Sequence, residues 1–368
     1  MQANLFKEEV QPVNLTNRVD WIDSVKVIAT LLVIIGHCTY YNIQSVYGGI
    51  SLLDYSCKAS VCSKLINYLI GFIYTFHMPL FMGISGMCLS LSMRKRKQSF
   101  SGLVRSKWKR LVVPFLGVSV FYSIPLKWLS GYWADSPNIL HDMFFGQLLL
   151  LGNTHLWYVL SLFWVFIAFY FIESLGLLHH KPVWILLLLV SWLGRYMEAS
   201  DMGFLGFAAS MEHLFYFSVG FYTLDRINKE LPRSLFYYLL SLSGLFLLYL
   251  AFTKCHPLFP QIFAIAKYPV ITALALIGGG NIVGLSRRLS FQMRNSKFIA
   301  LLKENTYELY LYSDPLNYII LAFVPCFVSG CFLESNVTAV SLFFIRFIFT
   351  AAGALIVSLV IKLGLKRK

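Results

Sequence analysis

Charged residues are scarce in this chain. Only 13% of its 368 residues are Asp, Glu, Lys or Arg, whereas 58% are hydrophobic, and the mean hydropathy is +0.67. A water-soluble fold cannot bury that much apolar surface. The composition therefore excludes an ordinary soluble domain and indicates a membrane protein.

Several familiar catalytic and metal-binding motifs are also missing. The sequence contains no Gly-x-Ser-x-Gly nucleophile elbow, no phosphate-binding loop and no His-Glu-x-x-His pair. Its seven cysteines include no Cys-x-x-Cys pair and no Cys/His spacing typical of zinc sites. We therefore expect no bound metal and no nucleophile of these types.

Apolar segments fill most of the chain. A membrane-spanning helix needs about 20 mostly apolar residues, and the sequence predicts an all-α, polytopic membrane helix bundle of about ten such helices. The segments near 182–197 and 204–224 are the least apolar, because Arg195, Glu212 and His213 interrupt them. The predicted spans lie near 25–42, 66–92, 111–130, 156–175, 182–197, 204–224, 235–253, 262–284, 304–325 and 337–363.

The net charge of +14 is concentrated in blocks at 94–110, 286–297 and 366–368. Cytoplasmic loops of membrane proteins carry an excess of Lys and Arg, so these blocks predict that both termini are cytoplasmic. The same rule predicts that the loops 131–154 and 326–336 are external, and an even number of spans agrees with it. An alternative role for the basic blocks is capture of an anionic cytosolic ligand such as a nucleotide phosphate.

Five cysteines are predicted to be external, and one of them is Cys255. Cys57 and Cys62 lie in the first external loop, and Cys326 and Cys331 lie in the last. That compartment is oxidising, so a structural disulfide among them is an open alternative to free thiols.

Lys26 and His37 lie within the first predicted span. They are eleven residues apart, which is about three turns and about 16 Å of helix rise, so they share one face. Asp23 and Thr30 fall on the same face, and this stripe is expected to point into the bundle. Lys26 can extend to the cytoplasmic boundary, whereas His37 needs a polar cavity or a partner. We interpret His37 either as a chemical group or as a histidine that hydrogen-bonds a neighbouring helix.

A second histidine, His77, stands two residues before Pro79, and Gly83, Ser85 and Gly86 follow. Pro79 lacks an N–H and interrupts the helix hydrogen bonds, while the small residues let other backbones approach. Two interpretations stay open: a kinked and tightly packed helix, or a kink that opens a cavity beside His77.

Further polar residues lie in or beside other predicted spans. His155 and Trp157 are expected at an external membrane boundary, where an interfacial aromatic anchor explains Trp157 without any site. Asp314 and Glu212 are carboxylates within predicted spans, and such groups are expected to be paired or functional. Either carboxylate could orient His37.

Four segments of the sequence together carry a family resemblance. "WIDSVKVIATLLVIIGH" (21–37) has an Asp, then a basic residue, then ten intervening residues, then a His. "FHMPLFMGISGMCLS" (76–90) contains an aromatic residue and a Pro-Leu-Phe run that leads to Ser-Gly. These segments resemble two signatures of membrane acyltransferase family 3, and "RLVVPFL" (110–116) and "HLWYV" (155–159) are similar to two more in the same order. The resemblance covers roughly 20–360.

The resemblance implies transfer of an acyl group, usually acetyl from acetyl-CoA, to an extracytoplasmic hydroxyl. The family's histidine falls on His37 and its basic residue on Lys26, and His77 fits the branch of stand-alone sugar O-acetylases. The basic segment 105–110 falls where the family keeps arginine near the donor. In the ninth helix, where a further histidine is expected, this chain departs from the pattern with Ser313-Asp314.

These patterns together define the candidate site. The candidate catalytic residues are His37, His77 and Asp314. The candidate substrate-binding residues are Asp23, Lys26, Ser85, Arg105, Arg110, His155, Trp157 and Glu212.

The resemblance also implies the surroundings of the site. The donor is cytosolic acetyl-CoA, no metal is needed, and the acceptor is a glycan or glycolipid of the envelope, which places the protein in the bacterial cytoplasmic (inner) membrane. The domain organisation is then a cytoplasmic segment (1–22), a transmembrane acyltransferase domain (23–365) and a basic cytoplasmic tail (366–368).

Two other functions fit the same residues. One is acetylation of a small metabolite or a lipid headgroup. The other is a proton-coupled membrane transporter, in which buried His and Asp residues relay protons and a helix interrupted at Pro79 surrounds the substrate.

Overall fold

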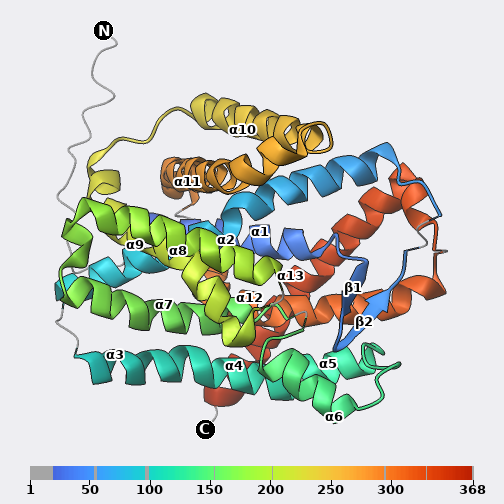
Figure 1. Ribbon diagram of the computed structural model, residues 1–368. Helices are drawn as coiled ribbons and strands as arrows, with labels where there is room; N and C mark the ends of the chain where they lie inside the picture. The colour runs from blue at the N-terminus through green and yellow to red at the C-terminus, as the bar shows by residue number, and fades with distance from the viewer. Residues whose placement is uncertain are drawn as a thin grey trace.

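The protein is a bundle of long α-helices (Figure 1). The computed structural model describes residues 20–53, 56–95, 99–152, 154–200, 202–293, 296–328 and 330–366. Most of the predicted N-terminal segment 1–22 and the end of the basic tail 366–368 lie outside the described residues. The long uninterrupted helices are α1 (Asp20–His37), α2 (Val61–Lys95), α7 (Trp157–Ser174), α8 (Lys181–Ala199), α9 (Phe207–Lys229), α10 (Leu235–Cys255), α11 (Pro260–Met293), α12 (Lys297–Phe323) and α13 (Asn336–Lys366).

One further long helix consists of five consecutive segments. Pro114 lacks an N–H, so the carbonyl of Arg110 loses the donor that it would have in an α-helix, and the hydroxyl of Tyr307 donates to that carbonyl at 3.0 Å. The basic residues 105–110 were expected in a loop, and that part of the prediction is wrong because the helix already begins at Phe100. Their cytoplasmic position stays a prediction. The segments are α3 (Phe100–Lys107), the π-helical η1 (Trp108–Val112), α4 (Val113–Val118), the π-helical η2 (Ser119–Ser123) and α5 (Ile124–Leu129).

The first helix ends earlier than hydropathy predicts. α1 stops at His37, whereas the predicted span continued to residue 42. Residues from Asn42 onward form an antiparallel hairpin of β1 (Asn42–Ser45) and β2 (Gly48–Ser51). We call the end of the bundle that carries this hairpin the hairpin end (Figure 1). The remaining short elements are α6 (Ile139–Asp142), η3 (Met143–Leu148), η4 (Leu177–His179), η5 (Phe204–Gly206), η6 (Val324–Cys326) and η7 (Phe332–Glu334).

Length and hydropathy identify membrane spans among these helices. Seven helices in the described residues are long and apolar enough to cross a membrane. The helices α1, α9 and α12 are not among the seven, and each carries several charged residues. The seven candidate spans are Val61–Arg94, Phe100–Leu129, Trp157–Ser174, Lys181–Ala199, Leu235–Cys255, Pro260–Ser290 and Asn336–Gly364.

The helices pack closely around α1 and α2. α1 contacts α2, α11 and α12, while α2 packs most extensively against α9. At the α2–α9 crossing, a Cβ added to Gly220 would lie 2.0 Å from the carbonyl oxygen of Gly83. The two backbones are therefore in direct contact there, which only glycine permits. The small residues around Pro79 thus bring helices together, as the sequence indicates, and α2 continues as one helix through Pro79.

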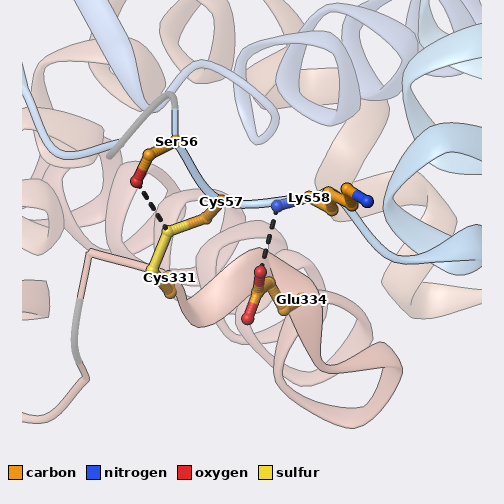
Figure 2. Close-up of a disulfide and its surroundings, with 5 residues drawn as sticks. All are labelled: Ser56, Cys57, Lys58, Cys331 and Glu334. Atoms are coloured by element: carbon orange, nitrogen blue, oxygen red, sulfur yellow. Dashed lines mark hydrogen bonds between the residues drawn. A yellow bond between two sulfur atoms is a disulfide. The ribbon is translucent and has the colours of Figure 1, made fainter.

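A disulfide joins two segments that are 274 residues apart in the sequence, at the hairpin end (Figure 2). Cys57, just before α2, is bonded to Cys331, just before α13, with 5.4 Å between their Cα atoms. The amide of Lys58 donates to Oε1 of Glu334 at 3.0 Å beside it. Two cysteines from loops that were predicted to be external are therefore paired, and the first and last of those loops lie together.

Candidate active site

His37 lies at the C-terminus of α1, and its side chain is mostly but not fully buried, with 16% of it exposed. The residue before it is Gly36, and a Cβ at that position would lie 2.8 Å from Cε2 of Tyr74. Gly36 therefore lets the ring of Tyr74, on α2, approach the end of α1. This close approach brings α1 and α2 together beside the imidazole of His37.

Asp314 pairs with two histidines from different helices. Its Oδ1 lies 2.9 Å from Nδ1 of His37, and its Oδ2 lies 3.3 Å from Nδ1 of His155. Nε2 of His155 also lies 3.0 Å from the carbonyl oxygen of Leu311, one turn before Asp314. The hydroxyl of Tyr310 donates to the backbone carbonyl of His155. Both ring nitrogens of His155 are thus engaged, whereas the pairing of His37 through Nδ1 leaves its Nε2 available to a ligand.

A buried arginine fixes the backbone around His37. Arg346 on α13 is fully buried. Its guanidinium donates to the carbonyls of His37 and Tyr40, both at 3.0 Å, and to Oδ1 of Asn317 at 3.2 Å. These bonds satisfy carbonyls that the end of α1 leaves without helical donors. They explain why α1 ends at His37, a boundary that hydropathy alone does not reveal.

Two cavities meet at this cluster. A cavity of about 230 Å³, here called the histidine cavity, is lined by four histidines: His37, His77, His155 and His213. A second cavity of about 440 Å³, here called the outer cavity, is lined in part by Asp314 and by the hairpin residues Asn42 and Gln44. Five residues line both cavities, and His37 therefore faces both: His37, Tyr74, His155, Trp157 and Glu198.

The other two histidines of the histidine cavity are bonded to their own helices. Nδ1 of His77 lies 3.1 Å from the carbonyl oxygen of Ile73, and Nδ1 of His213 lies 2.8 Å from that of Ala209. A carbonyl can only accept, so Nδ1 carries the proton in each ring. His77 therefore lies in the same cavity as His37, but its Nδ1 partner is a backbone carbonyl rather than a carboxylate.

Glu212 forms an ion pair rather than a contact with His37. Its Oε1 accepts a hydrogen bond of 2.8 Å from Nη1 of Arg195 on α8. The two helices meet closely there, because a Cβ on Gly194 would lie 2.4 Å from the backbone nitrogen of Glu212. The sequence left open whether Asp314 or Glu212 could orient His37, and the structure places Asp314, not Glu212, beside His37.

Some candidate residues lie away from the cluster. Lys26 pairs with Asp23 at 3.1 Å, toward the start of α1. Ser85 bonds to the hydroxyl of Tyr158 at 3.1 Å and to a carbonyl of its own helix. Arg105 and Arg110 are exposed on α3 and η1, and the linings of the described cavities do not include them. The structure thus brings together His37, His77, His155, Trp157, Glu212 and Asp314, and places the other candidates elsewhere.

Sequence reasoning missed two buried cations. Arg346 interrupts the apolar segment 337–363, and an ionisable residue within a span is a site candidate by default. Lys127 is also buried, and its Nζ donates to Oε1 of Gln147 at 3.0 Å and lies 4.9 Å from the centre of the Tyr318 ring. Tyr318 lines the outer cavity, so Lys127 supports its wall.

The described residues contain no group of three or more His, Cys, Asp or Glu side chains placed to hold a metal ion. A family model described as an acyltransferase domain matches residues 19–363, which is nearly the whole chain. No curated protein and no solved structure matches it.

Proposed function

The chain belongs to acyltransferase family 3, and from this we propose that it is an integral membrane O-acyltransferase of the bacterial cytoplasmic membrane. It transfers an acetyl group from cytosolic acetyl-CoA to a sugar hydroxyl of an envelope polysaccharide or glycolipid. The observation that carries the proposal is the pairing of His37 with Asp314 at the junction of two cavities. An imidazole oriented by a carboxylate is a common general base.

His37 acts as the general base in the proposed reaction. The acceptor hydroxyl gives its proton to Nε2 of His37 while its oxygen attacks the thioester carbonyl carbon. The carbon–sulfur bond then breaks, coenzyme A leaves as a thiolate, and the proton passes from His37 to the sulfur. One ester forms and one thioester is cleaved, so protons and electrons balance without any further reactant.

Asp314 orients His37 in this scheme. A carboxylate 2.9 Å from Nδ1 favours a proton on that nitrogen and leaves Nε2 as the basic one. It also stabilises the imidazolium that forms when His37 takes the hydroxyl proton. His155 holds the other carboxylate oxygen, so the carboxylate keeps its position between the two rings.

The outer cavity is the proposed route for the acceptor. It extends from His37 to the hairpin, and its lining combines Asn42, Gln44 and Glu198 with the indole of Trp157. Amide and carboxylate groups can bond sugar hydroxyls, and an aromatic face offers an apolar surface for a sugar ring. The disulfide at the same end supports an external position, because disulfides persist in oxidising compartments.

A proton-coupled transporter remains the second candidate. The observation that favours it is the presence of four histidines around one cavity, with Asp314 beside two of them. Such groups can relay protons in a membrane. Acetylation of a small metabolite or a lipid headgroup uses the same His37 chemistry with a different acceptor in the outer cavity.

The decisive experiment compares membranes that contain the wild-type chain, the His37→Ala variant or no copy of the chain. Each is supplied on its cytosolic side with acetyl-CoA labelled in the acetyl group, and base-labile label is measured in purified envelope glycans. We expect label with the wild-type chain alone. Solute uptake by the same vesicles without any labelled glycan, lipid or metabolite would instead identify a transporter.

A further inference from the structure

A third cavity, here called the inner groove, has a volume of about 500 Å³. It runs along α2 from Pro79 to Met87 and along α9 from Tyr216 to Ile227. α2 runs away from the hairpin end (Figure 1), and α9 runs beside it in the same direction, from Gly220 near Gly83 to Asp225 near Arg94. The groove therefore extends from the middle of the bundle toward the opposite end. The stretch of α9 from Tyr216 to Arg226 alone corresponds to about 15 Å of helix rise.

The walls of the inner groove are apolar and rich in glycine. α2 and α9 meet at Gly83 and Gly220, where the two backbones touch. The third wall is α11, where a Cβ added to Gly280 would meet no atom within 4 Å. The space beside Gly280 is therefore open. The whole groove, at about 500 Å³, is large enough for a small ligand.

Cations gather where the inner groove ends. Arg226, Arg233 and Arg287 line that end, together with the carboxylate Glu230. Nε of Arg226 bonds Oε1 of Glu230 at 2.9 Å, and Nη2 of Arg287 donates to the backbone carbonyl of Glu230 at 2.9 Å. Three arginines against one carboxylate leave a surplus of positive charge, which attracts anionic groups such as phosphates.

The other end of the inner groove adjoins the histidine cavity. Pro79 lines both, and His77 precedes it by two residues on α2. On α9, Glu212 and His213 line the histidine cavity, and Tyr216, one turn further on, lines the groove. The outer cavity, the histidine cavity and the inner groove thus follow one another along the bundle, with His37 between the first two.

We propose that the inner groove binds the acyl donor, a coenzyme A thioester. The phosphates lie at Arg226, Arg233 and Arg287, the pantetheine arm follows the groove, and the thioester reaches the histidine cavity beyond Pro79. This inference rests on the proposed function. It assigns the donor contacts to the arginines of the groove instead of Arg105 and Arg110, which line none of the described cavities.

The position of the groove beside the histidine cavity, with Pro79 lining both, favours this occupant over a phospholipid. A phospholipid would also place a phosphate near the arginines and a chain between α9 and α11. It has no need of a groove that ends beside His77, whereas a thioester must reach the base that activates its acceptor. The side opposite the hairpin is also the predicted cytoplasmic side, where the donor is found.

Filling the groove tests the proposal directly. Gly280→Leu places a side chain in the open space, and Gly244→Leu is its matched control. Gly244 is exposed on α10, and a Cβ there also meets no atom within 4 Å. The purified full chain is placed in phosphatidylcholine nanodiscs and titrated with coenzyme A. We expect the Kd to rise about tenfold or more for Gly280→Leu, as for loss of a well-packed contact, and to stay unchanged for Gly244→Leu.

A second variant tests the groove through its charge, without any change of a glycine. Arg233 is exposed, so Arg233→Gln preserves the fold, and we expect it to weaken coenzyme A binding about threefold to tenfold, with the loss largest at low salt. Equal affinity in Gly280→Leu and wild type, or a loss with Arg105→Gln but not with Arg233→Gln, would overturn the groove as the donor site.

The remaining outcomes also decide the matter. A wild-type chain that does not bind coenzyme A at all would overturn the proposed acyl donor, which is a failure of the function and not of the groove alone. If anionic phosphatidylglycerol in the nanodisc binds the wild-type chain more tightly than Gly280→Leu, while coenzyme A affinity is equal in both, the groove is a lipid site and the proposal is wrong.

Discussion

Nη2 of Arg346 donates a hydrogen bond of 3.0 Å to the backbone carbonyl of His37. The last helix of the chain therefore holds the last residue of the first helix. The same guanidinium binds the carbonyl of Tyr40 and the side chain of Asn317, three residues after Asp314. Arg346 therefore bonds the backbone of His37 and also the helix that carries Asp314.

Arg346→Met tests this support. The variant keeps a long apolar side chain but leaves two carbonyls and an amide oxygen without their donor, at a cost of about 1–3 kcal/mol for each group left unsatisfied. We expect a lower melting temperature and, in the folded fraction, a lower kcat with the donor KM unchanged. Ser358 also lies on α13, and its hydroxyl donates a buried hydrogen bond to Asn305 on α12. Ser358→Ala removes that bond and should reduce stability only. A kcat equal to wild type in folded Arg346→Met would show that the arginine does not position His37.

His37→Ala removes the proposed base. The side chain is at the end of a helix, so its loss is expected to leave the fold intact while transfer falls by about 10²–10⁴. His77→Gln is the comparison, because His77 lines the same cavity with Nδ1 bonded to a backbone carbonyl. We expect a smaller loss there. If single-turnover measurements gave equal losses for the two variants, His37 would not be the base by itself, and His77 would share that role.

Asp314→Asn replaces the orienting carboxylate with a group of the same size. An amide can present its N–H₂ to Nδ1 of His37, which selects the wrong tautomer, and such changes lower kcat by about 10²-fold or more. Melting temperature should change little, because a buried charge is removed. The adjacent Ser313→Ala is the control, and it should retain transfer. If Asp314→Asn and His37→Ala act independently, so that their losses multiply, the two residues do not form one unit.

Substitutions of Lys26 distinguish a role in pairing with Asp23 from a role in binding the donor. The structure pairs it with the buried Asp23 at 3.1 Å, so Lys26→Met should lower stability by about 1 kcal/mol, since the lysine itself is partly exposed. The donor KM should stay constant, and Asp23→Asn combined with Lys26→Met should recover part of the lost stability. Lys26→Arg should behave as wild type. A raised KM for acetyl-CoA in folded Lys26→Met, with melting temperature unchanged, would contradict pairing as its main role.

The disulfide gives a test of both stability and topology. Cys57→Ser should lower the free energy of unfolding by about 2–4 kcal/mol, because the bond closes a long loop. Cys62→Ser is the matched control, since Cys62 lies at the same end and is not disulfide-bonded. In Cys57→Ser, a membrane-impermeant thiol reagent added to intact cells should label Cys331 only if this end is external. Labelling of Cys331 from the cytoplasmic side alone would reverse the predicted topology.

The helical architecture follows from the sequence, but some boundaries do not. Hydropathy locates the segments that become α2, α7, α8, α10, α11 and α13. It extends the first span past His37 because it cannot detect the buried arginine from a helix some 300 residues away that satisfies the carbonyls at that turn. The charge of the segment 105–110 predicts a loop, whereas the segment lies on a helix that begins at Phe100.

The site was predictable only in part, for a similar reason. Periodicity places Asp23, Lys26 and His37 on one face of α1, and both Asp314 and Glu212 are visible as carboxylates in apolar segments. Which carboxylate meets His37 depends on how the helices pack, and the sequence alone does not fix that packing. His155 looks like a boundary residue by position, yet packing of its loop onto α12 buries it against Asp314.

The three helices that fall short of the apolarity of a membrane span carry His37, Glu212 and Asp314. During synthesis, a translocon sorts each segment by its own hydropathy, and Asp or Lys near a helix centre opposes lateral release into lipid. α1, α9 and α12 must therefore depend on apolar neighbours to remain in the bilayer. The side chains that we propose for the site thus make membrane insertion of this protein a collective process, and we expect substitutions in α2, α8 or α11 to impair biogenesis without any change in the site itself.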